Sequence, residues 1–186
     1  MIKKCFSLFI ALLLAVTSAF CSEARAEEGP KSLVVYFSAT GNTEKVAKLI
    51  AEETGSDILE IIPEEEYTSA DLNYRDNNCR ANREMNDDAA RPAIKSDLSA
   101  VEGYDIIYLG HPIWWGTAPR IIQTFLESYD LSKAVIYTFC TSGSSSISRS
   151  VRDLQSMYPD INISSGKRFA NASEREVRDW LKGLSE

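Results

Sequence analysis

The chain has 186 residues, 44% of them hydrophobic, and a formal net charge of −7 at neutral pH. This length is sufficient for one domain with a substantial core. The acidic balance argues against binding to nucleic acid or to anionic membrane surfaces, and it is compatible with a basic protein partner. The single histidine, and the lack of any Cys/His cluster with metal-ligand spacing, argue against a zinc site.

The first 26 residues have the features of a cleaved secretory signal peptide. Lys3 and Lys4 make the start of the chain basic, and residues 6–20 are apolar apart from Ser and Thr. Ala24 and Ala26 are small residues at the two positions that a signal peptidase recognises. The apolar run is shorter than the ~20 residues that a membrane span needs. We therefore predict cleavage after Ala26, export to the periplasm or the exterior, and a single domain over residues 27–186. Cleavage removes three basic residues and one acidic residue, which lowers the formal net charge to −9.

Four cysteines bear on the fate of the exported chain. Cys5 and Cys21 lie in the leader, and acylation of Cys21 would make a lipoprotein; we rank this second because Phe20 is large for the preceding position. Cys79 and Cys140 remain, 61 positions apart. Export permits a disulfide between them, but two free thiols fit the spacing equally well, and we favour free thiols.

The first regular elements form a strand, a turn and a helix. An apolar run over residues 33–37 leads into a polar turn and then a helical pattern over residues 44–54. The unpaired N–H groups and positive dipole end of that helix make an anion site. The turn adds hydroxyl and amide donors and one flexible glycine, and its candidate anion-binding residues are Ser38, Thr40, Gly41, Asn42 and Thr43.

This turn differs from two well-known phosphate loops. It lacks the Gly-Lys-Ser/Thr ending of a Walker A loop and the three glycines of a dinucleotide fingerprint. Because it contains no Lys or Arg, it suits a phosphate monoester better than a polyphosphate with magnesium. The alternative is a well-capped turn that binds nothing.

The rest of the chain alternates strands and helices. Further strands are predicted over residues 57–62, 104–110, 134–139 and 161–169. Helices are predicted over residues 120–129, over a stretch that includes Ile147, Val151 and Leu154, and over a last stretch that places Trp180 in the core. This order indicates one doubly wound α/β domain with a five-stranded parallel sheet.

Residues 63–97 are the least regular part of the chain. They are rich in Asp, Asn, Glu and Arg and contain Tyr67 and Tyr74. A loop this long in a compact domain is usually functional or disordered. We expect short helical turns over one rim of the sheet, with Arg80, Arg83 and Glu84 forming a solvated, ion-paired face.

Two more turns follow the third and fourth strands. The first has paired tryptophans between prolines, and its candidate ligand-binding residues are Pro112, Trp114, Trp115, Gly116 and Thr117. Neighbouring residues on a turn point apart, so we expect one indole against a flat ligand and the other packed into the protein. The second is small and hydroxylated, with candidates Thr141, Ser142 and Gly143. Ligands of such sheets bind beyond the carboxyl ends of the strands.

Two of these turns resemble the flavodoxin family. Residues 38–43 are similar to its hydroxyl-x-Thr-Gly-x-Thr loop, and residues 112–119 to the Pro-x-Trp-Trp-Gly-x-x-Pro loop of a flavodoxin-like subfamily. The resemblance implies strand order 2-1-3-4-5, binding of flavin mononucleotide (FMN), and a phosphate held by the first turn. The third turn departs from the family pattern, which has an Asp and a stacking Tyr there. The second face of the ring is then open, or covered by Tyr67 or Tyr74.

Three candidate functions are compatible with this resemblance. The first is a redox protein that carries electrons between partner proteins, which the acidic charge favours. The second is an FMN-dependent reductase that uses a nicotinamide donor and a quinone, which the open third turn favours. The third is a flavin-free binding module on the same fold. His111 and Arg120 are the cations near the second turn, and either is a candidate to neutralise a reduced ring. The alternative for His111 is a structural role at the strand end, with its hydrogen bonds made within the protein.

Overall fold

The computed structural model describes residues 29–184, so the predicted signal peptide lies outside the described residues. Five parallel strands form one sheet in the order β2-β1-β3-β4-β5, as predicted. The strands are β1 Ser32–Tyr36, β2 Asp57–Glu60, β3 Ile106–Pro112, β4 Val135–Thr141 and β5 Asn162–Phe169.

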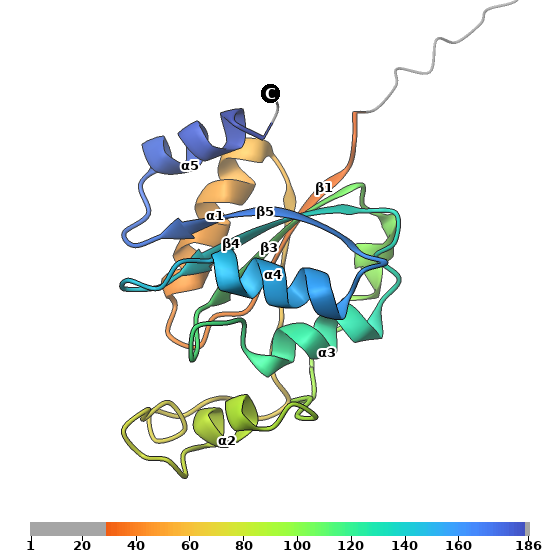
Figure 1. Ribbon diagram of the computed structural model, residues 1–186. Coiled ribbons are helices and arrows are strands. Elements are labelled where there is room, and N and C mark those ends of the chain that lie inside the picture. The colour runs from red at the N-terminus through yellow and green to blue at the C-terminus, as the bar shows by residue number, and fades with distance from the viewer. Residues whose placement is uncertain (1–28, 185–186) are drawn as a thin grey trace, which may run out of the picture.

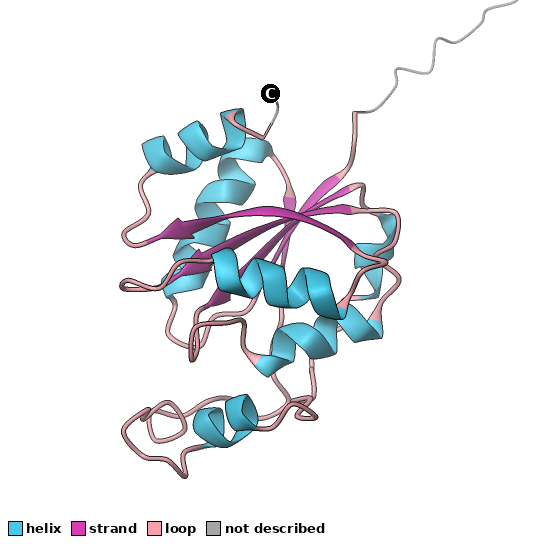
Figure 2. Ribbon diagram, in the orientation of Figure 1, coloured by secondary structure: helices cyan, strands magenta, loops and turns pink. Residues whose placement is uncertain are grey.

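Helices cover both faces of this sheet (Figure 1, Figure 2). α1 and α5 lie on one face, and α3 and α4 lie on the other. The helical elements are α1 Asn42–Thr54, α2 Arg80–Asn86, the 3₁₀ helix η1 Ser99–Gly103, α3 Arg120–Ser128, α4 Ser148–Met157 and α5 Glu174–Lys182. The 3₁₀ helix was not predicted from the sequence.

The strand β1 is buried on both faces, which explains its unbroken apolar sequence. Leu33 and Val35 pack with α3 and α4, whereas Val34 and Tyr36 pack with α1 and α5. All four side chains are at most 5% exposed. A central parallel strand covered on both sides has this composition.

Strands β3 and β4 run two residues beyond their predicted ends. Their ladder continues through the pairs His111–Cys140 and Pro112–Thr141. Both turns therefore begin from a hydrogen-bonded strand end, and Thr141 belongs to a strand rather than to a loop.

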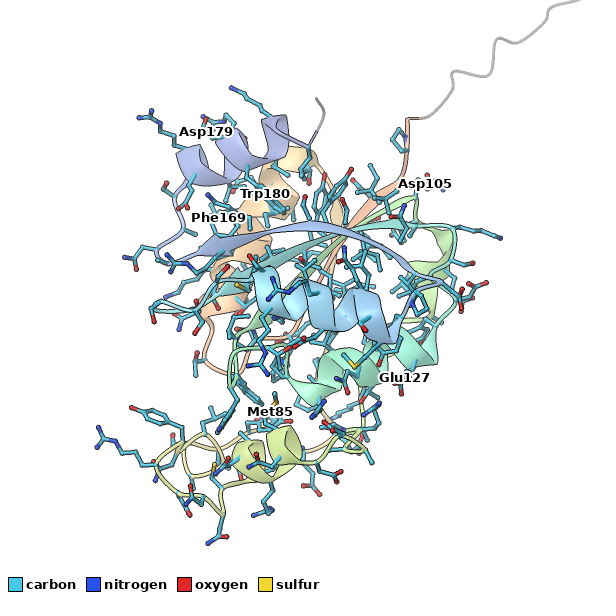
Figure 3. All side chains as sticks on the ribbon, in the orientation of Figure 1. Met85, Asp105, Glu127, Phe169, Asp179 and Trp180 are labelled. Atoms are coloured by element: carbon cyan, nitrogen blue, oxygen red, sulfur yellow. The ribbon has the colours of Figure 1, made fainter. Side chains whose placement is uncertain are left out.

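The last helix packs differently from the prediction for Trp180. This side chain is only partly buried, although it contacts an aromatic group that includes Phe169, at a ring-centroid distance of 5.8 Å. Figure 3 shows Trp180 on α5 next to Phe169 at the end of β5. The buried residue of α5 is Val177.

Residues 63–97 form a separate layer below the α/β body in Figure 1. They contain one regular helix, α2, which agrees with the expected short helical turns. The solvated face is wrong for Arg80 and Glu84, whose side chains are only 16% and 15% exposed. Glu84 accepts hydrogen bonds from Arg80 and from the hydroxyl of Tyr67, both at 2.6 Å, so these residues hold the layer together.

Arg120 joins this layer to the body. Its guanidinium lies on α3 but donates to the carbonyl oxygens of Glu84 and Met85 at the end of α2, at 3.3 and 3.2 Å. It also pairs with Asp88 at 2.5 Å. Figure 3 shows Met85 at the boundary between α2 and the body. Within residues 29–184, none of the helices has the length and apolar character needed to cross a membrane.

Candidate functional site

The first turn presents an open helix N-terminus. Gly41 precedes α1 with φ of 76°, a conformation that favours glycine. Among the described side chains, none caps α1, so its first N–H groups are available to a ligand. The hydroxyl of Ser38 is buried and has no hydrogen-bond partner in the described part of the chain. An unpaired buried hydroxyl of this kind is costly unless a ligand or water completes it.

The second turn is a tight hairpin that we call the Trp turn, residues 114–117. The N–H of Trp114 donates to the carbonyl of Thr117, and the N–H of Thr117 donates back, both at 3.0 Å. The central residues have positive φ, 48° for Trp115 and 85° for Gly116, as in a type I′ turn. Glycine tolerates this, but for tryptophan it is a strained conformation of the kind that clusters at functional sites.

The two indoles point into different surroundings, as predicted. Trp114 packs edge-on against Phe37 and Tyr67, with centroid distances of 5.6 and 5.1 Å. Trp115 is 40% exposed. Trp114 is therefore the packed indole, and Trp115 is the one free to contact a ligand.

These turns border a cavity of about 460 Å³, the first cavity. Its volume is in the range of small-molecule sites. Its lining combines five of the predicted site residues with three residues from the segment 63–97 and two apolar residues of the turns. The predicted ones are Thr40, Thr43, Pro112, Trp114 and Trp115, and the others are Ala39, Leu72, Tyr74, Ala81 and Ile113.

Four of these residues were not predicted from the sequence. Ala39 and Ile113 lie inside the predicted turns but carry no polar group that marks them. Leu72 and Ala81 come from the irregular segment, whose position depends on contacts with α3 that no local pattern indicates. Tyr74 was foreseen as a cover for a ring, and it lines the first cavity with 70% of its surface exposed. Tyr67 packs instead against Trp114.

The remaining predicted site residues lie around the first cavity rather than along its lining. Gly41 and Asn42 form the start of α1, and Ser38 lines a neighbouring cavity together with Glu60 and Tyr67. The hydroxyl of Thr141 is 2.8 Å from that of Thr43, which joins the end of β4 to the first turn of α1.

The outer parts of the second and third turns have protein partners of their own. The hydroxyl of Thr117 donates to Asp153 at 2.8 Å on the far side of the Trp turn. The carbonyls of Ser142 and Gly143 accept from Arg168. A ligand role for these three residues stays a prediction.

Neither proposed cation faces the first cavity. His111 is fully buried, its Nδ1–H donates to the carbonyl of Pro112 at 3.0 Å, and its Nε2 accepts from Ser150 at 3.2 Å. Burial lowers the pKa of His111 to about 4, so it is neutral at pH 7. Arg120 donates a hydrogen bond to the end of α2 and forms an ion pair with Asp88. The structural alternative for His111 is correct, and none of the described residues that line the first cavity is charged.

The two cysteines of the described chain are free thiols. Cys79 precedes α2, where its sulfur accepts from the N–H of Asn82. Burial raises the pKa of Cys140 to about 12, so it is an inert core residue. Over residues 29–184, no group of three or more His, Cys, Asp or Glu side chains could hold a metal ion.

Comparison with known proteins gives the family. The flavodoxin family model matches residues 31–184, which are most of the chain, so the chain belongs to the flavodoxin family. No curated protein sequence matches significantly.

Solved structures extend this result. A protein from Bacteroides uniformis, provisionally described as a flavoprotein, is 48% identical; the match covers 83% of this chain and 99% of that one, with a TM-score of 0.81. A similar protein from Bacteroides eggerthii is 42% identical, over 84% and 99%, also with a TM-score of 0.81. A flavoprotein from Lactobacillus acidophilus, solved in complex with FMN, is 25% identical over 82% and 99%, with a TM-score of 0.65.

Proposed function

We propose that this protein binds FMN in the first cavity and works as a redox protein that carries electrons between partners. The proposal rests on one observation: an uncapped helix N-terminus and the exposed indole of Trp115, on a strained backbone, border the same uncharged cavity. A flat ring with a phosphate tail needs these two features together. The FMN complex of the 25% identical relative supports the same ligand.

The phosphate fits the first turn chemically. The start of α1 offers backbone N–H groups and a positive dipole end, both of which favour an anion. Thr40 and Thr43 add hydroxyl donors where the turn meets the cavity. The unpaired Ser38 hydroxyl lies at the same turn, and a phosphate oxygen or a bound water is a suitable partner for it.

The ring fits the Trp turn. Trp115 offers an open indole face, and Trp114 fixes the turn by packing on Phe37 and Tyr67. Tyr74 also lines the cavity and can shield the second face. Stacking on an indole contributes roughly 0.5–1.5 kcal/mol beyond the burial of area. It also excludes water from one side of the ring.

Bound FMN would supply the redox chemistry, and the protein tunes and positions it. Because the described lining carries no charge, this chain stabilises the ring through stacking and backbone groups. The backbone of Gly116 is available at the tip of the Trp turn for hydrogen bonds to the ring edge, whereas the N–H and carbonyl of Thr117 are paired with Trp114. The acidic protein charge disfavours added negative charge on the ring, which favours a low reduction potential.

An FMN-dependent reductase is the second candidate. The 70% exposed side chain of Tyr74 leaves one side of the cavity accessible, as a small substrate requires. Steady-state turnover with a nicotinamide donor and a quinone separates the two: fast turnover favours the reductase, and its absence favours the electron carrier.

The test of the shared proposal is an absorption spectrum of the purified protein with added FMN, together with tryptophan fluorescence. We expect flavin bands that co-purify or bind on titration, and quenched fluorescence that is largely relieved by Trp115→Ala. Folded protein that stays colourless and unquenched would instead favour the flavin-free binding module.

We also propose that the chain is exported after cleavage behind Ala26, and that its partners are encountered outside the cytoplasm. Mass spectrometry of the cell-derived protein is expected to find Glu27 at the N-terminus. A lipid-modified N-terminal Cys21 would favour the lipoprotein alternative.

A further inference from the structure

A second cavity of about 440 Å³ lies on the other side of the Trp turn. It is formed where α2, α3 and α4 approach one another, and its lining includes Met85, Gln123 and Met157. Trp115 lines both cavities. The function proposed above makes no use of this second space.

The side-chain amide of Gln123, which lines the second cavity, lacks a full set of hydrogen-bond partners among the residues that the structure describes. Gln123 is 2% exposed, and its Oε1 has no hydrogen-bond partner among residues 29–184. In the same described range, its Nε2 has only the thioether of Met157, at 3.5 Å, which is a weak acceptor. A buried amide left in this state is costly unless something enters the cavity and completes it.

The charges around the second cavity are already balanced. Arg120 pairs with Asp88 at 2.5 Å, and Arg149 lies 3.6 Å from Asp153. Two cations and two carboxylates leave no net preference for an anion or a cation. An uncharged ligand is therefore favoured over a charged one.

The remaining lining sets the shape of that ligand. Trp115 offers an aromatic surface, and the sulfurs of Met85 and Met157 are polarizable groups that favour contact with rings. We propose that the second cavity binds a small, neutral aromatic ring bearing an N–H or O–H donor that reaches Gln123. Rings with a hydroxyl and rings with a primary carboxamide share this chemistry.

This inference goes beyond FMN binding and does not depend on it. Because Trp115 borders both cavities, a ligand in one is in contact with a wall of the other. Any effect of one ligand on the affinity of the other must be reciprocal. The site is therefore testable in the protein with and without FMN.

The experiment is an NMR titration of the protein with hydroquinone and with nicotinamide, observing the methionine methyls and the Trp115 indole N–H. We expect at least one ring to give saturable shifts at Met85, Met157 and Trp115, and the pair identifies which donor is preferred. Nicotinate, which replaces the amide with a carboxylate, should bind more weakly. Equal binding of nicotinate, or no saturable shift with either neutral ring, would overturn the proposal.

Two glutamine variants assign the binding to Gln123. Gln123→Met removes the unpaired amide at similar volume, so it should weaken binding roughly three- to tenfold while leaving stability unchanged or higher. Gln155→Met is the matched control, because Gln155 bonds to the carbonyl of Ile163 at 2.8 Å and lies outside the cavity. The control should keep ring binding and lose stability. Unchanged ring binding in Gln123→Met would contradict the assignment.

A surface variant keeps the test decisive if Gln123→Met folds poorly. Met157 is 43% exposed, so Met157→Glu places a charge in the cavity wall without disturbing the core. It should also weaken ring binding. FMN binding measured on the same samples tests the earlier proposal separately, since neither substitution lies in the first cavity.

Discussion

The first cavity has two walls of different origin. One wall comes from the turns that follow β1 and β3, and each turn starts from a hydrogen-bonded strand inside the sheet. The other comes from Leu72, Tyr74 and Ala81, in a segment held to the body through Arg120. The first wall, which we call the sheet wall, is positioned by backbone hydrogen bonds along the sheet. The second, which we call the segment wall, depends on a few side-chain contacts. Mutations should therefore affect the two walls differently.

The largest expected effect concerns His111, which lies in β3 just before the Trp turn of the sheet wall. Burial lowers the pKa of His111 from its ordinary 6.5 to about 4. The unfolded state therefore takes up a proton first as the pH falls. The contribution of His111 to the free energy of unfolding should fall by about 3 kcal/mol through the window from pH 6.5 to pH 4.

Denaturation curves at several pH values, for the wild type and His111→Gln, measure this effect by difference. The variant should lack the part of the slope that comes from His111. Parallel pH profiles for the two proteins would contradict a buried, neutral histidine.

The next effect concerns the segment wall. Arg120→Met removes the donors to the carbonyls of Glu84 and Met85, and should lower the free energy of unfolding by about 2 kcal/mol. Hydrogen exchange should show lost protection concentrated in residues 63–97. Arg91→Met is the control, because the exposed Arg91–Glu127 pair also joins this segment to α3 but should contribute under about 1 kcal/mol. Equal losses in both variants would remove the special role of Arg120.

Trp115 tests the strained part of the sheet wall. Both Trp115→Ala and Trp115→Gly should reduce FMN affinity roughly tenfold, because the stacking face is lost. The glycine variant should be more stable than the alanine variant by roughly 1 kcal/mol, since φ is positive there. Titration with FMN and chemical denaturation give the two quantities. If alanine were as stable as glycine, the strain at this residue would not be real.

Ser38 tests the polar end of the same wall. Ser38→Ala removes a buried hydroxyl without a partner in the described chain, so the FMN-free protein should be equally stable or more stable. FMN affinity should fall roughly three- to tenfold. Ser146→Ala, in the third turn, is a hydroxyl deletion that should leave affinity unchanged. A destabilised FMN-free Ser38→Ala protein would mean that the hydroxyl has a structural role instead.

Tyr74 gives the smallest expected effect. Its side chain is 70% exposed, so Tyr74→Ala should weaken FMN binding by about twofold or less, as surface substitutions usually do. The FMN titration used for the Trp115 variants measures it. A loss as large as that of Trp115→Ala would mean that the segment wall closes more tightly on the ligand than its exposure indicates.

The contrast between the walls also explains what the sequence could predict. The alternation of strands and helices and the first turn follow from local patterns: a continuous apolar run in β1, and hydroxyl residues around Gly41 before α1. The strand order came only from the resemblance to the flavodoxin family. The positive φ of Trp115 has no such signal, because it is imposed by the hairpin between Trp114 and Thr117.

The segment wall was harder still to predict. Arg120 is separated from Glu84 by 36 positions, and neither residue marks the other in the sequence. For the same reason, the role of Arg120 as a partner for a reduced ring was a wrong prediction. The second cavity likewise depends on α2, α3 and α4 meeting in space.

The central claim is that one turn holds a phosphate while the other contacts a flat ring. Calorimetric titration of the protein with FMN and with riboflavin, which lacks the phosphate, tests both parts at once. We expect FMN to bind, and riboflavin to bind to the same site distinctly more weakly. Absence of heat with FMN, or equal affinities for the two compounds, would contradict it.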